Sequence, residues 1–579
     1  AAERRFLHWE AAFPGVWDDW QRDLPHGGFD AVIGNPPWDR MKLQEVEWFA
    51  ARAPDIARAQ RASDRRRMVA ALREASASVA REYERAAWTA EAAARVAREC
   101  GAYPLLSGGD INLYALFVER AARLVRAEGI VGLLVPSGIA ADKGAAPFFR
   151  SISTAGRLAA LFDFENRRGR GREPFFPDVD SRFKFAALVF GERERRFAQA
   201  DCAFFQQDAA AAEASAFVLR PEDFAALNPN TGTAPVFRSR RDADITRGVY
   251  ARLPVLVDRR SDPPETVWPV RYFTMFHMTN DSGKFRTAAE LERLGAYRVR
   301  GGVWEKGAAL WLPLYEGKMV QAYDHRAASV TVNHENLNRP AQPEPATEAE
   351  HADAAWSPAP QFWVNEAEVE LPGDVPAFLA FKDIASPTNA RTMIAALVPR
   401  AGFGNKLPLL LPADDPAAYR RFVPLLVANF NAMVLDYVAR QKVHGTTLNL
   451  YILEQLPLIP AAGFRRRFGA MTAEAIIGED VLHLTYTADD MAGFAAEQGH
   501  AGPPFRWDGE DRLRRRARLD ALFFHLYGLD RDDAAYILGT FPIVEAEEVA
   551  QYGRFRSRDL ILGWMAALAA GRPDAEVEG

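Results

Sequence analysis

Four consecutive residues, Asn35-Pro36-Pro37-Trp38, bring together groups that could hold a planar amine. Asn35 carries a side-chain amide, the two prolines have backbone carbonyls but no N–H, and Trp38 supplies a large aromatic ring. A base with an exocyclic amine needs acceptors for its amine hydrogens and a surface on which to stack. The pattern therefore predicts a binding site for an amino-bearing ring.

The residues before this tetrapeptide predict the element that positions it. The apolar run Ala31-Val32-Ile33 is typical of a short buried strand that ends at Gly34. Two prolines then prevent both further strand pairing and an immediate helix. We expect a stiff loop at the carboxyl end of a strand, where open α/β sheets place their ligands. The alternative is a proline-rich turn whose Trp38 packs only for core reasons.

The stretch 30–38, Asp-Ala-Val-Ile-Gly-Asn-Pro-Pro-Trp, resembles the catalytic motif of DNA amino-methyltransferases, most often the N6-adenine enzymes. The resemblance implies that the side chain of Asn35 and the carbonyl of Pro36 accept hydrogen bonds from the target amine. It also implies that Pro37 belongs to the catalytic loop and that Trp38 stacks on the extruded base. It places Asp30 with the substrate-binding residues, as a residue that shapes the loop. It also implies S-adenosyl-L-methionine as methyl donor, direct transfer without a covalent intermediate, and no metal.

The next two hundred residues fit a partial Rossmann-like methyltransferase domain. Residues 41 to about 105, rich in Ala, Arg and Glu, predict a helical insertion. An amphipathic helix capped near Asp110 follows, and then strands near 130–135, 158–164 and 185–190, which predict half of a doubly wound sheet. Segments that resemble the same family are 112–117, 132–138, 162–167 and 176–185. By that resemblance Tyr114, Pro136 and Ser137 border the base pocket; alternatively they only pack a helix and end a strand.

The cofactor-binding part of such an enzyme is missing from the sequence. Only thirty-four residues precede Asn35, too few for the two strand–helix units that carry the glycine turn and carboxylate. Ala401-Gly402-Phe403-Gly404-Asn405 is a candidate glycine turn without a clear preceding strand and following helix. We expect the cofactor-binding residues to lie outside this chain. We also expect the chain to be a fragment that cannot catalyse methyl transfer alone.

Composition predicts a cytoplasmic protein of several domains. The 579 residues exceed one ordinary core, no stretch of eighteen apolar residues spans a membrane, and no signal peptide is visible. Cys100 and Cys202 fit a reducing compartment better than a disulfide framework. The net charge of −6 does not by itself favour binding of a polyanion. The segments 167–172 and 238–241 are nevertheless basic, and they are predicted either to contact phosphates or to be solvated surface loops.

From about residue 226 the sequence resembles the target-recognition domain of type IIG-like and related phage-defence methylases. Short aromatic segments there carry side chains of the types that contact bases. From these we predict Asn280, Lys318 and Arg326 as DNA-binding residues. A metal nuclease built from Asp281, Asp324 and His325 is disfavoured, because no carboxylate–x–Lys pair accompanies them. Residues 328–358 predict a polar insertion or flexible loop, and the last hundred residues are mainly helical.

The sequence thus predicts an α/β chain in three parts: 1–225 from a methyltransferase catalytic domain, 226–460 for target recognition, and a helical region over 461–579. The predicted function is N6-adenine methylation of duplex DNA within restriction–modification or phage defence. Alternatives are methylation of cytosine N4 or of a protein glutamine, a nuclease–methylase fusion or association with restriction subunits, and a binding-only module. The large downstream domain favours DNA over a protein substrate.

Overall fold

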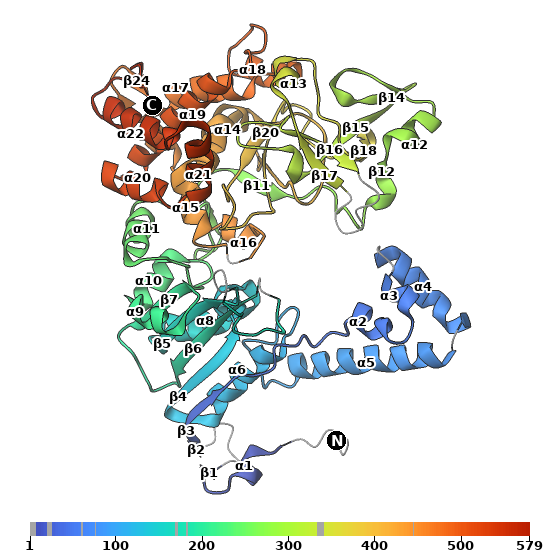
Figure 1. The fold of residues 1–579 in the computed structure, drawn as a ribbon, viewed down its shortest axis with the longest axis vertical. Coiled ribbons are helices and arrows are strands. Elements are labelled where there is room, and N and C mark those ends of the chain that lie inside the picture. The colour runs from blue at the N-terminus through green and yellow to red at the C-terminus, as the bar shows by residue number, and fades with distance from the viewer. Residues whose placement is uncertain are drawn as a thin grey trace. The chain divides into compact units, whose positions relative to one another are not determined.

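The computed structural model describes residues 7–19, 26–58, 62–75, 77–167, 172–180, 183–332, 341–443 and 445–578. The chain divides into two compact units, Ala1–Arg247 and Gly248–Gly579 (Figure 1). Each unit combines helices with sheets, which confirms the mixed α/β class at that level. The division into three parts with boundaries near 225 and 460 stays a prediction.

The first unit is built on a six-stranded mixed sheet. Its strands, in spatial order, are β3 (Phe29–Gly34), β4 (Val125–Pro136), β6 (Lys184–Gly191), β5 (Leu158–Glu165), β7 (Ala200–Gln206) and β8 (Phe217–Leu219). β3 runs parallel to β4 and β5 parallel to β7, whereas β6 is antiparallel to both β4 and β5. The expected strands are therefore present, but an antiparallel strand lies among them in place of a purely parallel arrangement.

The strand predicted over 31–33 is present as part of β3, but the prediction that it is buried is wrong. Within the described residues β3 is an edge strand that pairs along one side only, with β4. Ala31 is exposed and the Ile33 side chain is 90% exposed. A continuous apolar run is typical of strands covered on both faces; here aromatic residues pack on Phe29 at the start of the strand, whereas no described segment covers Ile33.

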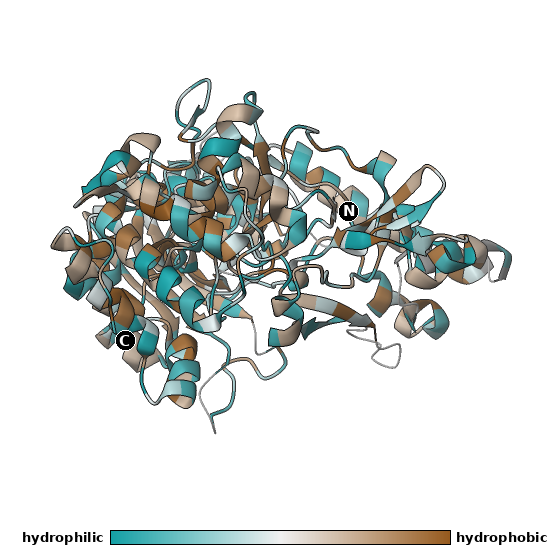
Figure 2. Cartoon of the chain, turned by 90° about the horizontal axis from the view of Figure 1, so that it is seen from above, coloured by the Kyte–Doolittle hydropathy of each residue, from teal (hydrophilic) through white to brown (hydrophobic). Residues whose placement is uncertain are grey.

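Helix α6 (Leu113–Leu124) leads directly into β4 and buries one face. Its N-cap is Asn112, whose side chain accepts the Tyr114 N–H at 3.4 Å, so the cap lies two residues after the predicted Asp110. Figure 2 shows apolar and polar residues interleaved along the helices, as expected where each helix buries a single face.

The predicted helical insertion is confirmed. It consists of α2 (Glu45–Ala50), α3 (Pro54–Arg58), α4 (Ala62–Ala75) and α5 (Ala77–Glu99). Phe49, Ile56, Leu72 and Ala80 form its own small core, against which Tyr83 packs. In Figure 1 this helical arm, residues 45–99, extends away from the six-stranded sheet of the same unit.

The second unit contains two larger sheets and most of the later helices. The four-stranded sheet is β11 (Val270–Phe273), β22 (Leu409–Pro412), β19 (Phe378–Phe381) and β20 (Ala395–Val398). The six-stranded sheet is β12 (Phe285–Arg286), β18 (Trp363–Asn365), β15 (Ala309–Tyr315), β14 (Trp304–Lys306) and β13 (Tyr297–Arg298), with β21 (Gly402–Phe403) beside β15. The main helices are α14 (Pro416–Asn431), α15 (Met433–Arg440), α17 (Ala473–Thr485), α19 (Gly509–Leu526), α20 (Arg531–Leu538), α21 (Pro542–Tyr552) and α22 (Arg556–Ala569). The helical character of the last hundred residues is confirmed.

Residues 328–358, predicted as a polar insertion or flexible loop, form regular elements in their described part, so the flexible-loop alternative is wrong there. β16 (Ala328–Val332) pairs antiparallel with β17 (Ala341–Pro345), and α13 (Glu348–Ala352) follows. A capping box between Thr347 and Glu350 begins this helix. Pro and Glu residues along β17 are tolerated because its side chains are mostly exposed.

None of the described helices is by itself long and apolar enough to cross a membrane. The pair α14 and α15, bent by 58° at their junction, meets the length and composition test only when taken together.

Candidate amine-binding site

The loop 35–38 lies at the carboxyl edge of the six-stranded sheet. Because β3, β4, β5 and β7 point the same way, their last residues meet at one edge, where antiparallel β6 begins. The register pairs Gly34 with Leu133 and Pro136 with Phe185. Asn35 therefore follows directly from a strand end, beside the end of β4, as predicted for a ligand-binding loop.

Two acceptors of this loop are unused. Asn35 is exposed, and its carboxamide makes no hydrogen bond to any described residue. Pro36 is buried, and its carbonyl accepts no hydrogen bond from the described residues. The carboxamide oxygen of Asn35 and the carbonyl oxygen of Pro36 therefore have no hydrogen-bond partner in the described part of the chain.

Trp38 is partly buried and packs on the sheet edge. Its indole N–H donates to the carbonyl of Leu134 at 3.4 Å. The ring stacks near Phe185 at 6.1 Å and meets Phe176 edge-on at 5.1 Å. The indole is therefore held in one orientation and is neither sealed in the core nor free in solvent.

Asn166 holds the segment that carries Phe176. This asparagine is 0% exposed; its carboxamide accepts the Phe176 N–H at 2.9 Å and donates to the carbonyls of Phe176 and Val179, both at 3.0 Å. Sequence reasoning included Asn166 in a family-like segment but did not select it as a site residue. The available signal was an amide side chain directly after a strand.

A second polar cluster lies at the same edge on the opposite face of the sheet. Ser137 donates to the buried carboxyl of Asp163, whose other oxygen accepts the Phe205 N–H at 3.4 Å. Burial raises the pKa of Asp163, and the nearby ammonium of Lys184 offsets this only in part. Phe205 has a positive φ of 59°, which is strained for a residue with a side chain. The ammonium of Lys184 and the guanidinium of Arg238 lie 4.2 and 4.7 Å from the centroid of its ring.

Three predicted residues of the first unit take different places. Pro136 ends β4 at the carboxyl edge. Tyr114 is 7% exposed on α6, where burial and the Asp142 carboxylate raise its pKa. Asp30 pairs with Arg126 at 3.0 Å near the start of β3, and five residue steps along the strand, about 16 Å, lie between it and Asn35.

The three residues of the second unit that were predicted to contact DNA differ in how far they are exposed. Asn280 is exposed in a loop, whereas Lys318 is half-buried, pairs with Glu316 at 3.0 Å and donates to the carbonyl of Ala341. Arg326 cannot contact DNA, because its side chain is 0% exposed. Its guanidinium donates to the backbone carbonyls of 351, 353, 356 and 487, which makes it a structural residue.

The glycine turn at 401–405 does not fit S-adenosyl-L-methionine. Gly402 and Phe403 form β21, a buried strand parallel to β15. A Cβ at Gly402 would lie 2.5 Å from the side chain of Val364, and one at Gly404 would lie 2.8 Å from that of Met278. These glycines serve close packing.

Among the described residues no group of three or more His, Cys, Asp and Glu side chains is arranged to hold a metal ion. Asp324 instead accepts from His351 at 3.1 Å, and His325 pairs with Asp490 at 3.0 Å. These contacts link parts of the second unit to one another.

No protein-family model matches the chain, and no curated protein matches it in sequence. Several solved structures resemble its fold loosely. The Type IIL restriction–modification enzyme MmeI in complex with DNA is 12% identical over 78% of this chain and 54% of that one, with a TM-score of 0.36. The type IIG restriction endonuclease BpuSI is 10% identical over 75% and 51%, with a TM-score of 0.24. The ATP-dependent Type ISP restriction–modification enzyme LlaBIII bound to DNA is 9% identical over 73% and 28%, with a TM-score of 0.32. The chain thus spans about half the length of the first two, and its structural neighbours are restriction–modification enzymes.

Proposed function

We propose that this chain carries the base-binding part of an S-adenosyl-L-methionine-dependent DNA methyltransferase that acts on adenine N6 within a restriction–modification or phage-defence system. One observation carries the proposal: Asn35 and Pro36, whose side-chain and backbone oxygens have no partner among the described residues, and Trp38, whose indole is held in one orientation, lie in one loop at the carboxyl edge of the sheet. That arrangement suits the exocyclic amine of a base extruded from duplex DNA.

The chemical contribution of these residues follows from the electronic structure of an aromatic amine. Its nitrogen lone pair is delocalised into the ring, so the amine is a poor nucleophile. Two acceptors aimed at the amine hydrogens favour the pyramidal nitrogen that develops only as the new N–C bond forms. Asn35 and Pro36 would therefore stabilise the transition state more than the ground state.

The position of Phe176 bears on how the base enters. Phe176 meets Trp38 edge-on, with ring planes at 69° and centroids 5.1 Å apart, so a base stacked at about 3.5 Å on the side of the indole that Phe176 contacts would compete with it for space. We infer that the base stacks on Trp38 only after Phe176 has moved. The segment of Phe176 would then close on the base from the side opposite Trp38.

The open edge of β3 supports the expectation that other polypeptide completes the sheet. Ile33 exposes 90% of its surface, and no described residue pairs with the free side of β3. Such an edge is normally covered or paired. We propose that the covering segment carries the cofactor site and that this chain alone does not methylate.

Two other amines would suit the same loop, cytosine N4 and the amide of a protein glutamine. A nuclease joined to or associated with the methylase, or a catalytic domain kept only for binding DNA, are the remaining alternatives. Binding to duplex DNA separates the DNA-directed functions from a protein methylase.

The decisive experiment is to express the full-length gene in cells without DNA methylation and to sequence the modified bases. We expect N6-methyladenine at one short recognition sequence. N4-methylcytosine would favour the first alternative, and unmodified DNA from a well-expressed, folded protein would refute the proposal.

A further inference from the structure

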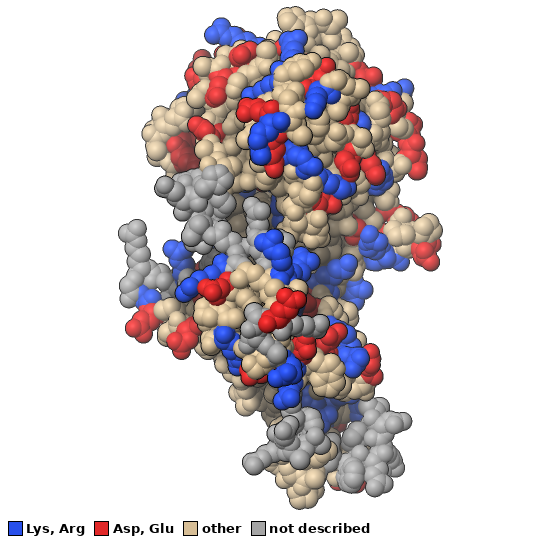
Figure 3. Space-filling view, turned by 90° about the vertical axis from the view of Figure 1, so that its right-hand side faces the viewer, with Lys and Arg blue, Asp and Glu red and all other residues tan. Residues whose placement is uncertain are grey.

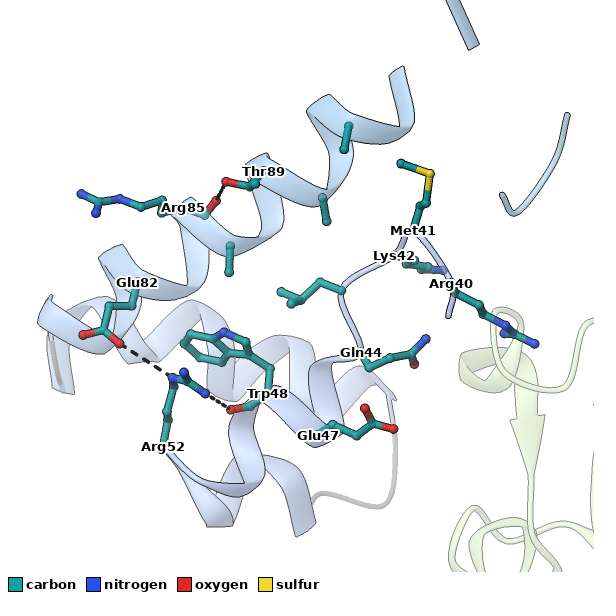
Figure 4. Close-up of a pocket in the computed structure, with 14 residues that line it drawn as sticks. Arg40, Met41, Lys42, Gln44, Glu47, Trp48, Arg52, Glu82, Arg85 and Thr89 are labelled. Atoms are coloured by element: carbon teal, nitrogen blue, oxygen red, sulfur yellow. Dashed lines mark hydrogen bonds and ion pairs between the residues drawn. The ribbon is translucent and has the colours of Figure 1, made fainter. Parts of the chain in front are cut away.

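We propose that a groove in the helical arm binds the sugar–phosphate backbone of DNA beside the extruded base. The groove, about 850 Å³, lies between α5 and the segment that leaves the catalytic loop, residues 40–48 (Figure 4). The inference rests on the proposed function, because that function supplies the DNA, but it concerns residues outside the amine-binding loop.

The charge of the groove favours an anionic ligand. Its walls carry the cations Arg40, Lys42, Arg52 and Arg85 against the two carboxylates of Glu47 and Glu82. Arg52 pairs with Glu82 at 3.7 Å and lies 4.5 Å over the ring of Trp48. In the described part of the chain, the charged groups of the other three cations have no acidic partner.

This local excess contrasts with the wider surface. On the face drawn in Figure 3, Lys and Arg side chains are interspersed with Asp and Glu. A surface of mixed charge attracts a polyanion weakly, whereas several unpaired cations along one groove attract it at a defined place.

The shape of the groove favours an extended anion over a compact one. In Figure 4 the side chains of Arg40 and Arg85 extend from opposite ends and do not converge on a common point. The wall formed by α5 runs from Glu82 to Ala93, about 16 Å at the rise of an α-helix. Backbone phosphates spaced along a strand match this arrangement better than a single phosphate does.

The position of the groove in the chain connects it to the base. Arg40 follows Trp38 by two residues, which span at most about 7 Å. Backbone hydrogen bonds fix this exit to the start of α6: Leu113 N–H donates to the carbonyl of Asp39 at 2.8 Å, and Met41 N–H to that of Ile111 at 2.9 Å. A nucleotide whose base stacks on Trp38 would therefore have its neighbouring phosphates close to Arg40 and Lys42.

The test compares a groove variant, Lys42→Gln with Arg85→Gln, with a matched control, Arg95→Gln. Arg95 is exposed on the same helix but does not line the groove. Affinity for a short fluorescein-labelled duplex is measured by fluorescence anisotropy at several KCl concentrations, without cofactor. We expect the double variant to bind more weakly and the slope of log K against log[salt] to become less negative by about 2, while the control keeps the wild-type slope.

An unchanged slope in the folded double variant, or a wild-type chain that does not bind duplex DNA, would overturn the inference. Circular dichroism checks folding, and if the double variant is unfolded, Lys42→Gln alone, in an exposed irregular segment, should change the slope by about 1. If DNA binding depends on the groove but the full-length protein leaves no methylated base in cells, only the proposed function is refuted. If the full-length protein methylates DNA but the double variant keeps the wild-type slope of log K against log[salt], only the inference about the groove is refuted.

Discussion

Asn166 and Phe176 are joined by a reciprocal pair of hydrogen bonds, in which the asparagine side chain accepts the Phe176 N–H at 2.9 Å and donates to the Phe176 carbonyl at 3.0 Å. This contact places the Phe176 ring against Trp38. A fully buried amide side chain therefore sets one wall of the candidate amine-binding site.

Replacing Asn166 by Ala should destabilise the first unit by about 3 kcal/mol, because the N–H of Phe176 and the carbonyls of Phe176 and Val179 lose their partner. Asn166→Asp should also destabilise the unit: it keeps an acceptor for the N–H, but it places a buried carboxylate against the two carbonyls. Urea unfolding measures both. The exposed Glu173 of the same segment provides the control, Glu173→Ala, which should be neutral. Equal stability of Asn166→Ala and wild type would contradict this role.

Asn35→Ala in the full-length protein should reduce methylation at least about 100-fold, because one of the two amine acceptors is lost. Affinity for duplex DNA should stay within a few-fold of wild type, since Asn35 has no structural hydrogen bond to lose. Methyl incorporation and anisotropy measure the two quantities. Asp39, an exposed residue four positions after Asn35, gives a control, Asp39→Ala, that should methylate normally. Wild-type turnover of Asn35→Ala would end the mechanism.

Trp38→Ala should weaken capture of the extruded base by about 10-fold or more, whereas Trp38→Phe should keep part of the stacking surface. The readout is the fluorescence of 2-aminopurine placed at the mapped target position, which rises when the base leaves the stack. The alanine variant also loses packing against Phe185, so its unfolding midpoint must be measured beside its fluorescence. Equal fluorescence in all three proteins would show that Trp38 serves packing alone.

The stability of the first unit should depend on pH through Asp163. Burial raises the pKa of this carboxyl above its ordinary value of 3.8. Below that value both states are protonated; as pH rises past it, the unfolded state loses its proton first, so stability falls until the folded carboxyl ionises as well.

Asp163→Asn removes this dependence and keeps an acceptor for the Ser137 hydroxyl. Its stability relative to wild type should therefore increase as pH rises above 3.8. Urea midpoints measured as a function of pH provide the test, with Asp201→Asn, exposed on the neighbouring strand β7, as the control. A constant difference between Asp163→Asn and wild type over that range would show that the pKa of Asp163 is not raised.

Local chemistry explains what could be predicted from the sequence. The loop 35–38 could be predicted because prolines restrict their own backbone and end a strand whatever lies around them. The helical arm could be predicted because its small core depends on apolar residues at helical spacing within one segment. The strands over 158–164 and 185–190 were likewise visible in apolar runs bounded by turns.

Tertiary structure decided the features that depend on distant neighbours. The same apolar pattern predicts a covered strand, yet Ile33 is exposed because no described segment lies against it. Arginine is a residue type that often contacts DNA, but the guanidinium of Arg326 is buried and donates to the backbone carbonyls of 351, 353, 356 and 487. Phe176 faces Trp38 only because Asn166 anchors its segment. Burial and side-chain pairing are set by residues far apart in the chain, and a single sequence does not encode those distances in any local pattern.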